Sequence, residues 1–286
     1  MEKTNKSAGG SLGARRALAY IVLIFLTILC LFSFYILIVN ATRSHSEIGK
    51  GFSALPGSRG LTNLRNLMSD PNLPVFTGLR NSLIVAACSA ALSVYFSALT
   101  AYAIHCYDFK GRNIIFTFIL LIMTIPTQVT ALGFINLMDK FKMMDTFWPL
   151  IIPSVAAPAV FFFMKQYMDG ALPLEIVEAA RIDGSNEFGT FNRIVLPIMK
   201  PAFAVQAIFA FVTSWNNYFT PALILKKDNL KTLPILIAQL RSADFLKFDM
   251  GKVYMMIFLS ILPVVVVYLF LSKYIIQGVA LGSVKG

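Results

Sequence analysis

The sequence predicts an all-α, polytopic membrane protein with six transmembrane helices. Hydrophobic residues make up 57% of the 286 residues and charged residues only 14%, whereas a soluble domain usually carries about a quarter charged residues. The mean hydropathy is +0.71. The apolar residues fall in blocks of about 20 or more, the length that an α-helix needs to cross a bilayer. None of these blocks has the alternating pattern of a β-barrel strand.

Six apolar runs are long enough to span the hydrocarbon core at about 1.5 Å rise per residue. The third run is interrupted by Pro126 and Gln128, and the fourth contains Pro153 and Pro158. We expect one transmembrane domain, 17–286, after an N-terminal tail, 1–16. The predicted spans are 17–39, 82–104, 114–138, 148–167, 202–225 and 253–276.

The basic residues favour an orientation with both termini in the cytoplasm. Arg15 and Arg16 precede the first span, and Lys110 and Arg112 lie in the short second loop, which fits the positive-inside rule. Two lysines in the outer loop, 139–147, weaken this argument. The first run exceeds the roughly 7–15 apolar residues of a cleaved signal peptide, so we expect a retained anchor. The net charge of +11 indicates anionic lipid rather than nucleic acid as the partner.

A charged segment, 170–201, separates the fourth and fifth runs. Pro173 suits the first turn of a helix, and the charge of Glu175 would meet the positive end of that helix. Gly184 is well placed as a left-handed C-cap. A second helical stretch is expected at 186–196. The segment is therefore predicted to be a helix–turn–helix outside the bilayer.

The side chains of this hairpin allow two interpretations. Ala179 and Ala180 are small, so another surface could approach closely, and the charges of Glu178, Arg181 and Asp183 could set the register against a partner. A solvated hairpin that only connects two spans is the alternative on these residues alone.

The spacing within this segment resembles a known motif. Glu178-Ala179-Ala180 is followed by three residues, Gly184, nine residues, Ile194, one residue and Leu196-Pro197. This pattern resembles the EAA loop in the permease subunits of bacterial ABC importers. Nearly the whole chain is similar to the carbohydrate branch of that family, which includes the smaller permease of the maltose importer. Further similar segments are YDFKGR (107–112), DGS (183–185) and the ending QGVALGSVKG (277–286).

The resemblance implies a coupling role for the segment 170–201. Its first helix would dock on a separate ATPase through Glu178, Ala179, Ala180, Arg181, Asp183 and Gly184. Two ATPase subunits would bind ATP and Mg²⁺, while this chain would bind no cofactor or metal and would not be an enzyme. The absence of the phosphate-binding GxxxxGK[ST] pattern agrees with this. The other implied partners are a second, homologous permease and an extracellular solute-binding protein, which would contact the loop 226–252 unless that loop is simply solvated.

Polar residues inside apolar runs are candidates for a substrate pathway, because such groups are costly at membrane depth. In the fifth run these are Trp215, Asn216, Asn217 and Tyr218, where aromatic rings and amides suit a sugar. Alternatively, the asparagines bond between helices and the aromatic residues belong to the interfacial belt. Gln128 is a second candidate, or it satisfies backbone groups at the Pro126 kink.

The function that the sequence predicts is ATP-driven import of a sugar or oligosaccharide. A peptide or polyamine is the alternative cargo, and a membrane-embedded enzyme or scaffold is the alternative class. No carboxylate lies in the middle of a span, which argues against a proton- or sodium-coupled carrier. The sequence does not identify the sugar.

Overall fold

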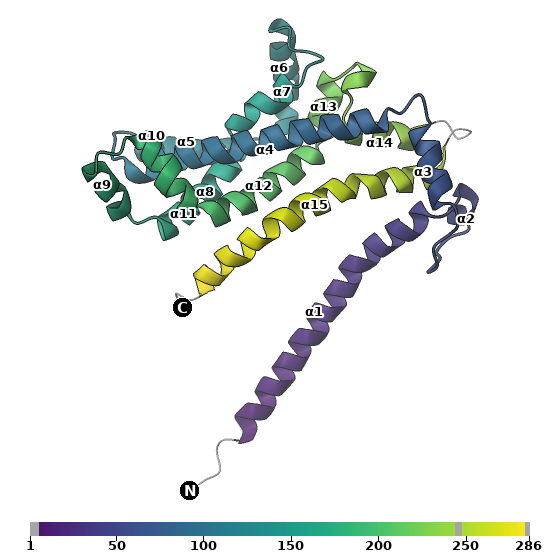
Figure 1. Ribbon diagram of the computed structural model, residues 1–286, viewed down its shortest axis with the longest axis horizontal. Coiled ribbons are helices and arrows are strands. Elements are labelled where there is room, and N and C mark those ends of the chain that lie inside the picture. The colour runs from purple at the N-terminus through teal and green to yellow at the C-terminus, as the bar shows by residue number, and fades with distance from the viewer. Residues whose placement is uncertain (1–5, 244–247, 284–286) are drawn as a thin grey trace. The chain divides into compact units, whose positions relative to one another are not determined.

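The computed structural model describes residues 6–243 and 248–283, which form helices and connecting turns without a strand (Figure 1). Four helices are long and apolar enough to cross a membrane, or up to six if each of two bent pairs counts as one span. The predicted all-α membrane class is thereby confirmed. Residues 1–5 of the predicted tail and 284–286 of the C-terminal ending lie outside the described residues, and 6–16 continue the first helix.

The chain divides into two compact units, the first made of residues up to 70 together with 240–259. This unit contains α1 (Lys6–Ala41), which includes the first predicted span, and two short helices, α2 (His45–Gly49) and α3 (Gly60–Met68). The guanidinium of Arg43 is buried and donates to Asn40 Oδ1 at 3.1 Å and to the Gly51 carbonyl at 3.0 Å. The segment that follows α1 in this unit is thus ordered partly by a buried, hydrogen-bonded arginine.

The second unit, residues 71–239 and 260–286, is organised around α4 (Val75–Cys106). Helices α8 (Pro158–Ala171) and α12 (Lys200–Trp215) pack along α4. The buried face of α4 is rich in small side chains, with Ser89, Ser93 and Ser97 interspersed among alanines. Small residues let helix backbones approach closely, and the hydroxyls of Ser89 and Ser97 donate across to the carbonyls of Leu150 and Ala157.

The third predicted span is not one helix. Helix α5 (Arg112–Ile122) and helix α6 (Thr127–Lys140) meet at an angle of 97°. Pro126 has no N–H to continue the helical ladder and disfavours a helical conformation in the residue before it. The fourth span, predicted at 148–167, extends over Trp148–Ala171. Its prolines divide it into α7 (Trp148–Ile151), the 3₁₀ turn η1 (Ile152–Val155) and α8.

The fifth predicted span is also broken, at its most polar point. Helix α12 ends at Trp215, and the short helix α13 (Phe219–Ile224) begins after Tyr218. The second predicted span extends further than expected, since α4 starts at Val75, and the sixth lies within α15 (Met250–Ser283). Between α13 and α15 lie η3 (Asp228–Leu230) and α14 (Leu233–Arg241).

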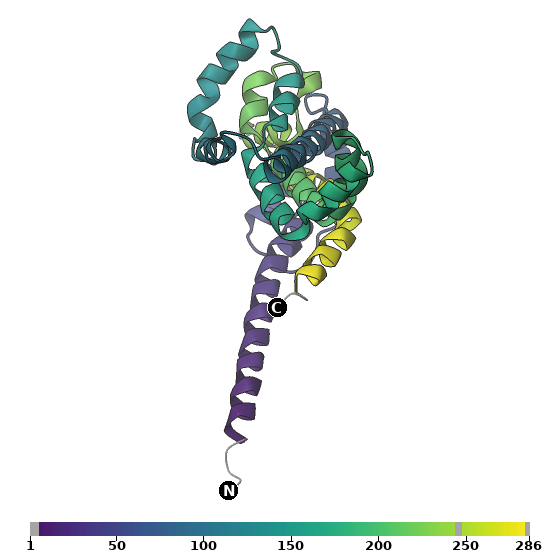
Figure 2. The same ribbon diagram turned by 90° about the vertical axis from the view of Figure 1, so that its left-hand side faces the viewer.

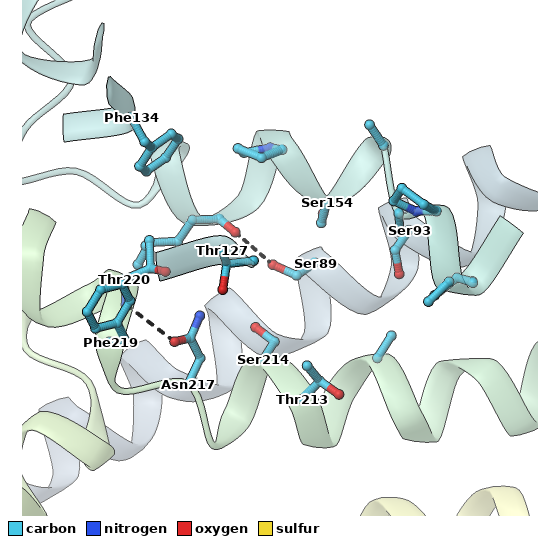
Figure 3. Close-up of a pocket in the computed structure, with 18 of the residues that line it drawn as sticks. Ser89, Ser93, Thr127, Phe134, Ser154, Thr213, Ser214, Asn217, Phe219 and Thr220 are labelled. Carbon is cyan, nitrogen blue, oxygen red and sulfur yellow. Dashed lines mark hydrogen bonds between the residues drawn. The ribbon is translucent and has the colours of Figure 1, made fainter. Parts of the chain in front are cut away.

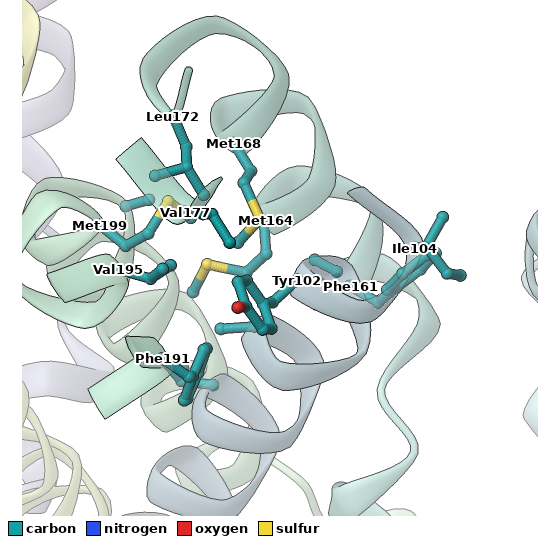
Figure 4. Close-up of a cluster of buried hydrophobic side chains, with 14 residues drawn as sticks. Tyr102, Ile104, Phe161, Met164, Met168, Leu172, Val177, Phe191, Val195 and Met199 are labelled. Atoms are coloured by element: carbon teal, nitrogen blue, oxygen red, sulfur yellow. The ribbon is translucent and has the colours of Figure 1, made fainter. Parts of the chain in front are cut away.

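The largest side chains of one buried cluster connect α4 and α8 with the segment 172–199 (Figure 4). Met164 and Met168 of α8 pack in this cluster with Val177, Phe191 and Met199, and all five are fully shielded from solvent. Apolar burial of this kind is the main stabilising term in a packed core. The charged segment between the fourth and fifth spans is therefore held on the ends of α4 and α8.

Candidate functional site

The first helix of the charged segment is α9 (Leu174–Ile182), and its first turn contains Glu175. Pro173 occupies the N-cap position, just before the first turn in which it was expected. Val177 and Ala180 face inward and are buried, whereas Glu178, Ala179 and Asp183 are exposed. Of the two alanines expected to admit a partner surface, Ala179 is available for such a contact and Ala180 is covered by the chain itself.

The helix ends in a Schellman turn at Gly184. The Ser185 N–H donates to the Ala180 carbonyl and the Gly184 N–H to the Arg181 carbonyl, each at 3.0 Å. Gly184 has φ +79°, the left-handed conformation that this motif requires and that glycine adopts without steric cost. The predicted glycine C-cap is confirmed.

The second half of the hairpin is helical, as predicted for 186–196, but it contains a π-helical turn. It comprises α10 (Glu187–Thr190), the π turn η2 (Phe191–Val195) and α11 (Leu196–Ile198). The Asn186 side chain caps α10 by accepting the Gly189 N–H at 2.7 Å. An 83° bend then separates α11 from α12.

A network of charged and aromatic side chains joins the two halves. Arg181 Nε lies 2.7 Å from Glu187 Oε1, and the guanidinium lies 5.2 Å from the centre of the Tyr107 ring. The Tyr102 hydroxyl, from α4, donates to Glu187 Oε2 at 2.7 Å. The hydrogen bond from Arg181 lowers the pKa of Glu187 to about 2, against the opposing effect of burial and with help from Tyr107 and Tyr102. Arg181 thus holds the hairpin together from within.

Ile182 and Phe188 are the most exposed large apolar side chains of the hairpin, at 86% and 67%. Glu178, Ala179 and Asp183 on the same hairpin are exposed as well. Exposed apolar groups flanked by charges are typical of a protein contact. Figure 2 views the chain from the end at which α9 and α10 lie. Sequence reasoning missed Ile182 and Phe188, although two large hydrophobic residues in a charged loop were a usable signal.

A hollow of about 1360 Å³ lies elsewhere in the same unit, between α4, α6, the segment 149–163, α12 and α13 (Figure 3). Its wall carries uncharged polar side chains and aromatic rings, and no Lys, Arg, Asp or Glu belongs to it. The polar members are Ser89, Ser93, Thr127, Thr130, Ser154, Gln206, Thr213, Ser214, Asn217 and Thr220, and the aromatic members are Phe134, Phe163, Phe209 and Phe219.

Of the five residues predicted for a substrate pathway, the wall of this hollow contains Asn217. Trp215 is instead buried, stacks on Phe211 with ring centres 5.6 Å apart, and donates from Nε1 to the Ser260 carbonyl at 3.1 Å. Asn216, Tyr218 and Gln128 are exposed and lie outside the wall. The break after Trp215 turns adjacent side chains in different directions, so the polar cluster does not form one site.

The other wall residues were not predicted as site residues. Ser89 and Ser93 are four positions apart on α4, and Thr213 and Ser214 precede the break in α12. Hydroxyl residues at helical spacing within an apolar run were the available signal, but the same pattern also arises from helix packing. Among the described residues, no group of three or more His, Cys, Asp or Glu side chains could hold a metal ion.

Comparison with known proteins identifies the relatives of this arrangement. Residues 93–280 match the family described as the binding-protein-dependent transport system inner membrane component. The chain is 35% identical to the arabinooligosaccharides transport system permease protein AraQ of Bacillus subtilis (strain 168), over 91% of this chain and 92% of that protein. It is 29% identical to the trehalose/maltose transport system permease protein MalG of Thermococcus litoralis, over 95% and 98%.

A solved structure confirms the fold. The crystal structure of a bacterial ABC transporter involved in the import of the acidic polysaccharide alginate contains a chain that aligns with this one at a TM-score of 0.78. The sequences are 20% identical, and the alignment covers 96% of this chain and 99% of the other.

Proposed function

The chain belongs to the family of binding-protein-dependent transport system inner membrane components, and we propose that it is a permease subunit through which a bacterial ABC importer moves a neutral oligosaccharide. As a member of this family it is a multi-pass inner-membrane protein that works with a partner permease, an ATPase and a solute-binding protein. Beyond the family, we propose the class of cargo, a site for it in the hollow beside α4, and a contact surface for the ATPase on the hairpin.

The composition of the hollow carries the choice of cargo. Of the 29 described residues that line it, ten are uncharged and polar, four are phenylalanines, the other 15 are aliphatic residues, glycine or proline, and none is charged. Hydroxyl and amide groups exchange hydrogen bonds with sugar hydroxyls, and aromatic rings pack on the apolar faces of sugar rings. A polyamine, a peptide terminus or a phosphate would bring a charge that needs an opposite charge when it leaves water.

The names of the relatives narrow the cargo further. Two relatives at 35% and 34% identity, from Bacillus subtilis and Halalkalibacterium halodurans, are both arabinooligosaccharides transport system permease proteins. We therefore take arabino-oligosaccharides as the first candidates. A relative at 29% identity is an sn-glycerol-3-phosphate transport system permease protein, and the uncharged wall argues against that anion here.

In this proposal the hairpin is the surface through which the ATPase drives the membrane helices. Glu178, Ala179, Asp183 and Gly184, with the exposed Ile182, form the surface offered to the ATPase, while Ala180 and Arg181 hold the hairpin together from within. ATP and Mg²⁺ are bound by two ATPase subunits and not by this chain. Both termini and the hairpin lie in the cytoplasm, and the second permease is homologous but not identical.

The test uses the complete importer reconstituted in liposomes with its solute-binding protein. We expect ATP-dependent uptake of labelled arabinotriose and none of spermidine or a tripeptide. Loss of one hydrogen bond, worth about 1 kcal/mol, should weaken uptake by roughly fivefold in Asn217→Ala. Asn216→Ala is the matched control because this neighbouring asparagine lies outside the wall. Uptake of spermidine but not of sugar would refute the proposal, as would equal effects of the two substitutions.

A further inference from the structure

The last turn of α4 places His105 between two hydrogen-bond acceptors. Its Nδ1 lies 2.9 Å from Asp169 Oδ1, near the end of α8, and its Nε2 lies 2.9 Å from the Leu172 carbonyl oxygen. Only 11% of the side chain is exposed. The ring is therefore held by two partners that are more than 60 residues further along the chain and that belong to the approach to α9.

The two partners determine the charge of the ring. A carbonyl oxygen and an ionised carboxylate only accept hydrogen bonds, whereas a neutral imidazole has one N–H to donate. The ammonium of Lys165 also contacts Asp169 Oδ1, which favours the ionised carboxylate. Both ring nitrogens must then carry protons for both hydrogen bonds to form. Two acceptors on the two ring nitrogens are therefore the arrangement that suits an imidazolium.

This imidazolium connects three elements. Leu172 is the C-cap of α8, where a cation is favourable because carbonyl groups are unpaired at a helix C-terminus. Leu172 also lies two residues before the start of α9, and its side chain is buried in the cluster that holds the hairpin. His105 thus ties the end of α4 and the end of α8 to the start of the coupling hairpin.

The neighbouring charged groups do not replace this contact. Lys165 is committed to Asp169, and Arg181 and Glu187 bond to each other, with Tyr102 on Glu187. The other titratable groups at this end of α4 and in the loop to α5 are the Cys106 thiol, Tyr107, Asp108, Lys110 and Arg112. Among the described residues, none of these donates to the Leu172 carbonyl, so deprotonation of His105 removes one of its two hydrogen bonds.

We propose that His105, in its doubly protonated form, is a positioning residue that fixes the coupling hairpin to the membrane helices, so that transport driven by ATP weakens as the cytoplasmic side becomes alkaline. This proposal rests on the function proposed above.

The test measures ATP hydrolysis by the complete importer in nanodiscs, with and without its sugar-loaded binding protein, from about pH 6 to about pH 8.5. We expect the stimulated-to-basal ratio of the wild type to fall with rising pH. His105→Gln, which is neutral, should lower the ratio by about 2- to 10-fold near pH 6.5, as expected for one lost hydrogen bond, and flatten the profile.

Two further variants separate positioning from general structure. His105→Arg keeps a permanent charge and several donors, so it should retain the ratio without pH dependence. His45→Gln removes the other histidine of the chain and should keep the wild-type profile. A wild-type profile in His105→Gln, or a wild-type pH dependence in His105→Arg, would overturn the proposal.

NMR of the His105 ring tests the inference without a His105 variant, and so also serves if those variants do not assemble. In His45→Gln with ¹⁵N-histidine in this subunit alone, one histidine remains, and its ring shifts report the protonation state. We expect two protonated ring nitrogens near pH 6.5, and the spectrum of a single neutral tautomer would overturn the inference. If no sugar-loaded binding protein stimulates the wild-type importer, the proposed cargo fails while this spectrum still decides the state of His105.

Discussion

Replacing Gly184 by alanine should uncouple the hairpin without disturbing the membrane helices. No atom lies within 4 Å of the position that a Cβ would occupy, so the added methyl group meets no obstacle. The cost comes from the backbone, because φ is +79° and the left-handed conformation costs a residue with a Cβ about 1–2 kcal/mol. That energy corresponds to a roughly 5- to 30-fold higher population of the opened turn relative to the ordered one.

Hydrogen–deuterium exchange in the assembled importer measures this population directly. The amides of residues 184 and 185 donate to the Arg181 and Ala180 carbonyls, so their exchange should accelerate by about 5- to 30-fold in Gly184→Ala. Gly184→Asn should have a smaller effect, since asparagine tolerates the left-handed region better. Uptake should fall in the same order.

Gly170→Ala is the matched control. A Cβ at Gly170 also meets nothing within 4 Å, but this glycine lies in α8 without a positive φ. Alanine is preferred to glycine in a helix, so uptake and exchange at residues 184 and 185 should stay at wild-type levels. If Gly184→Ala behaved like Gly170→Ala, the argument that the turn conformation matters for coupling would be refuted.

Two further predictions concern single contacts. Glu187 has a pKa lowered to about 2 from 4.5, mainly by Arg181, so its stabilising effect is present above pH 4.5 and is lost as the pH falls toward 2. Cleavage of the hairpin by pepsin should rise over that range in the wild type, and Glu187→Gln should be cleaved readily throughout; parallel curves would contradict this. Trp215→Phe removes the hydrogen bond to the Ser260 carbonyl and should lower stability by about 1 kcal/mol. The unfolding temperature should then fall while uptake per folded importer is kept, and loss of uptake in a fully stable variant would instead place Trp215 in the pathway.

The hairpin was largely predictable because its signals are local. A proline at the first turn, an acidic residue beside it and Gly184 at the end specify a helix and its stop from neighbouring residues alone. Arg181 was the exception. Its partners Glu187 and Tyr107 lie in other elements, so the sequence could not tell whether its charge pointed to a partner protein or back into the chain.

The hollow was much less predictable because it is assembled from distant segments. Asn217 and Trp215 are two positions apart, yet the end of α12 sends one into the wall and the other onto Phe211. Which way a side chain points after a helix end depends on the local break, and hydrophobic periodicity contains no information about it. Pro126 indicated a kink in the third run, but the size of that bend and the break after Trp215 were not predicted, since an apolar run shows that a segment is buried in lipid but not that it is straight.

The small side chains on the buried face of α4 have a mechanical consequence. Serines and alanines let α8 and α12 approach closely, but they form only low ridges, unlike the long side chains that interlock at most helix contacts. Such a contact resists separation of the helices, because every atom of the interface is close to a neighbour. Around Ser89, Ser93 and Ser97 it offers little resistance to movement along the helix axis, since the α4 side chains there are short. The small residues that let α4 lie close to α8 and α12 therefore also suit it to a sliding motion between α4 and the helices that carry the coupling hairpin.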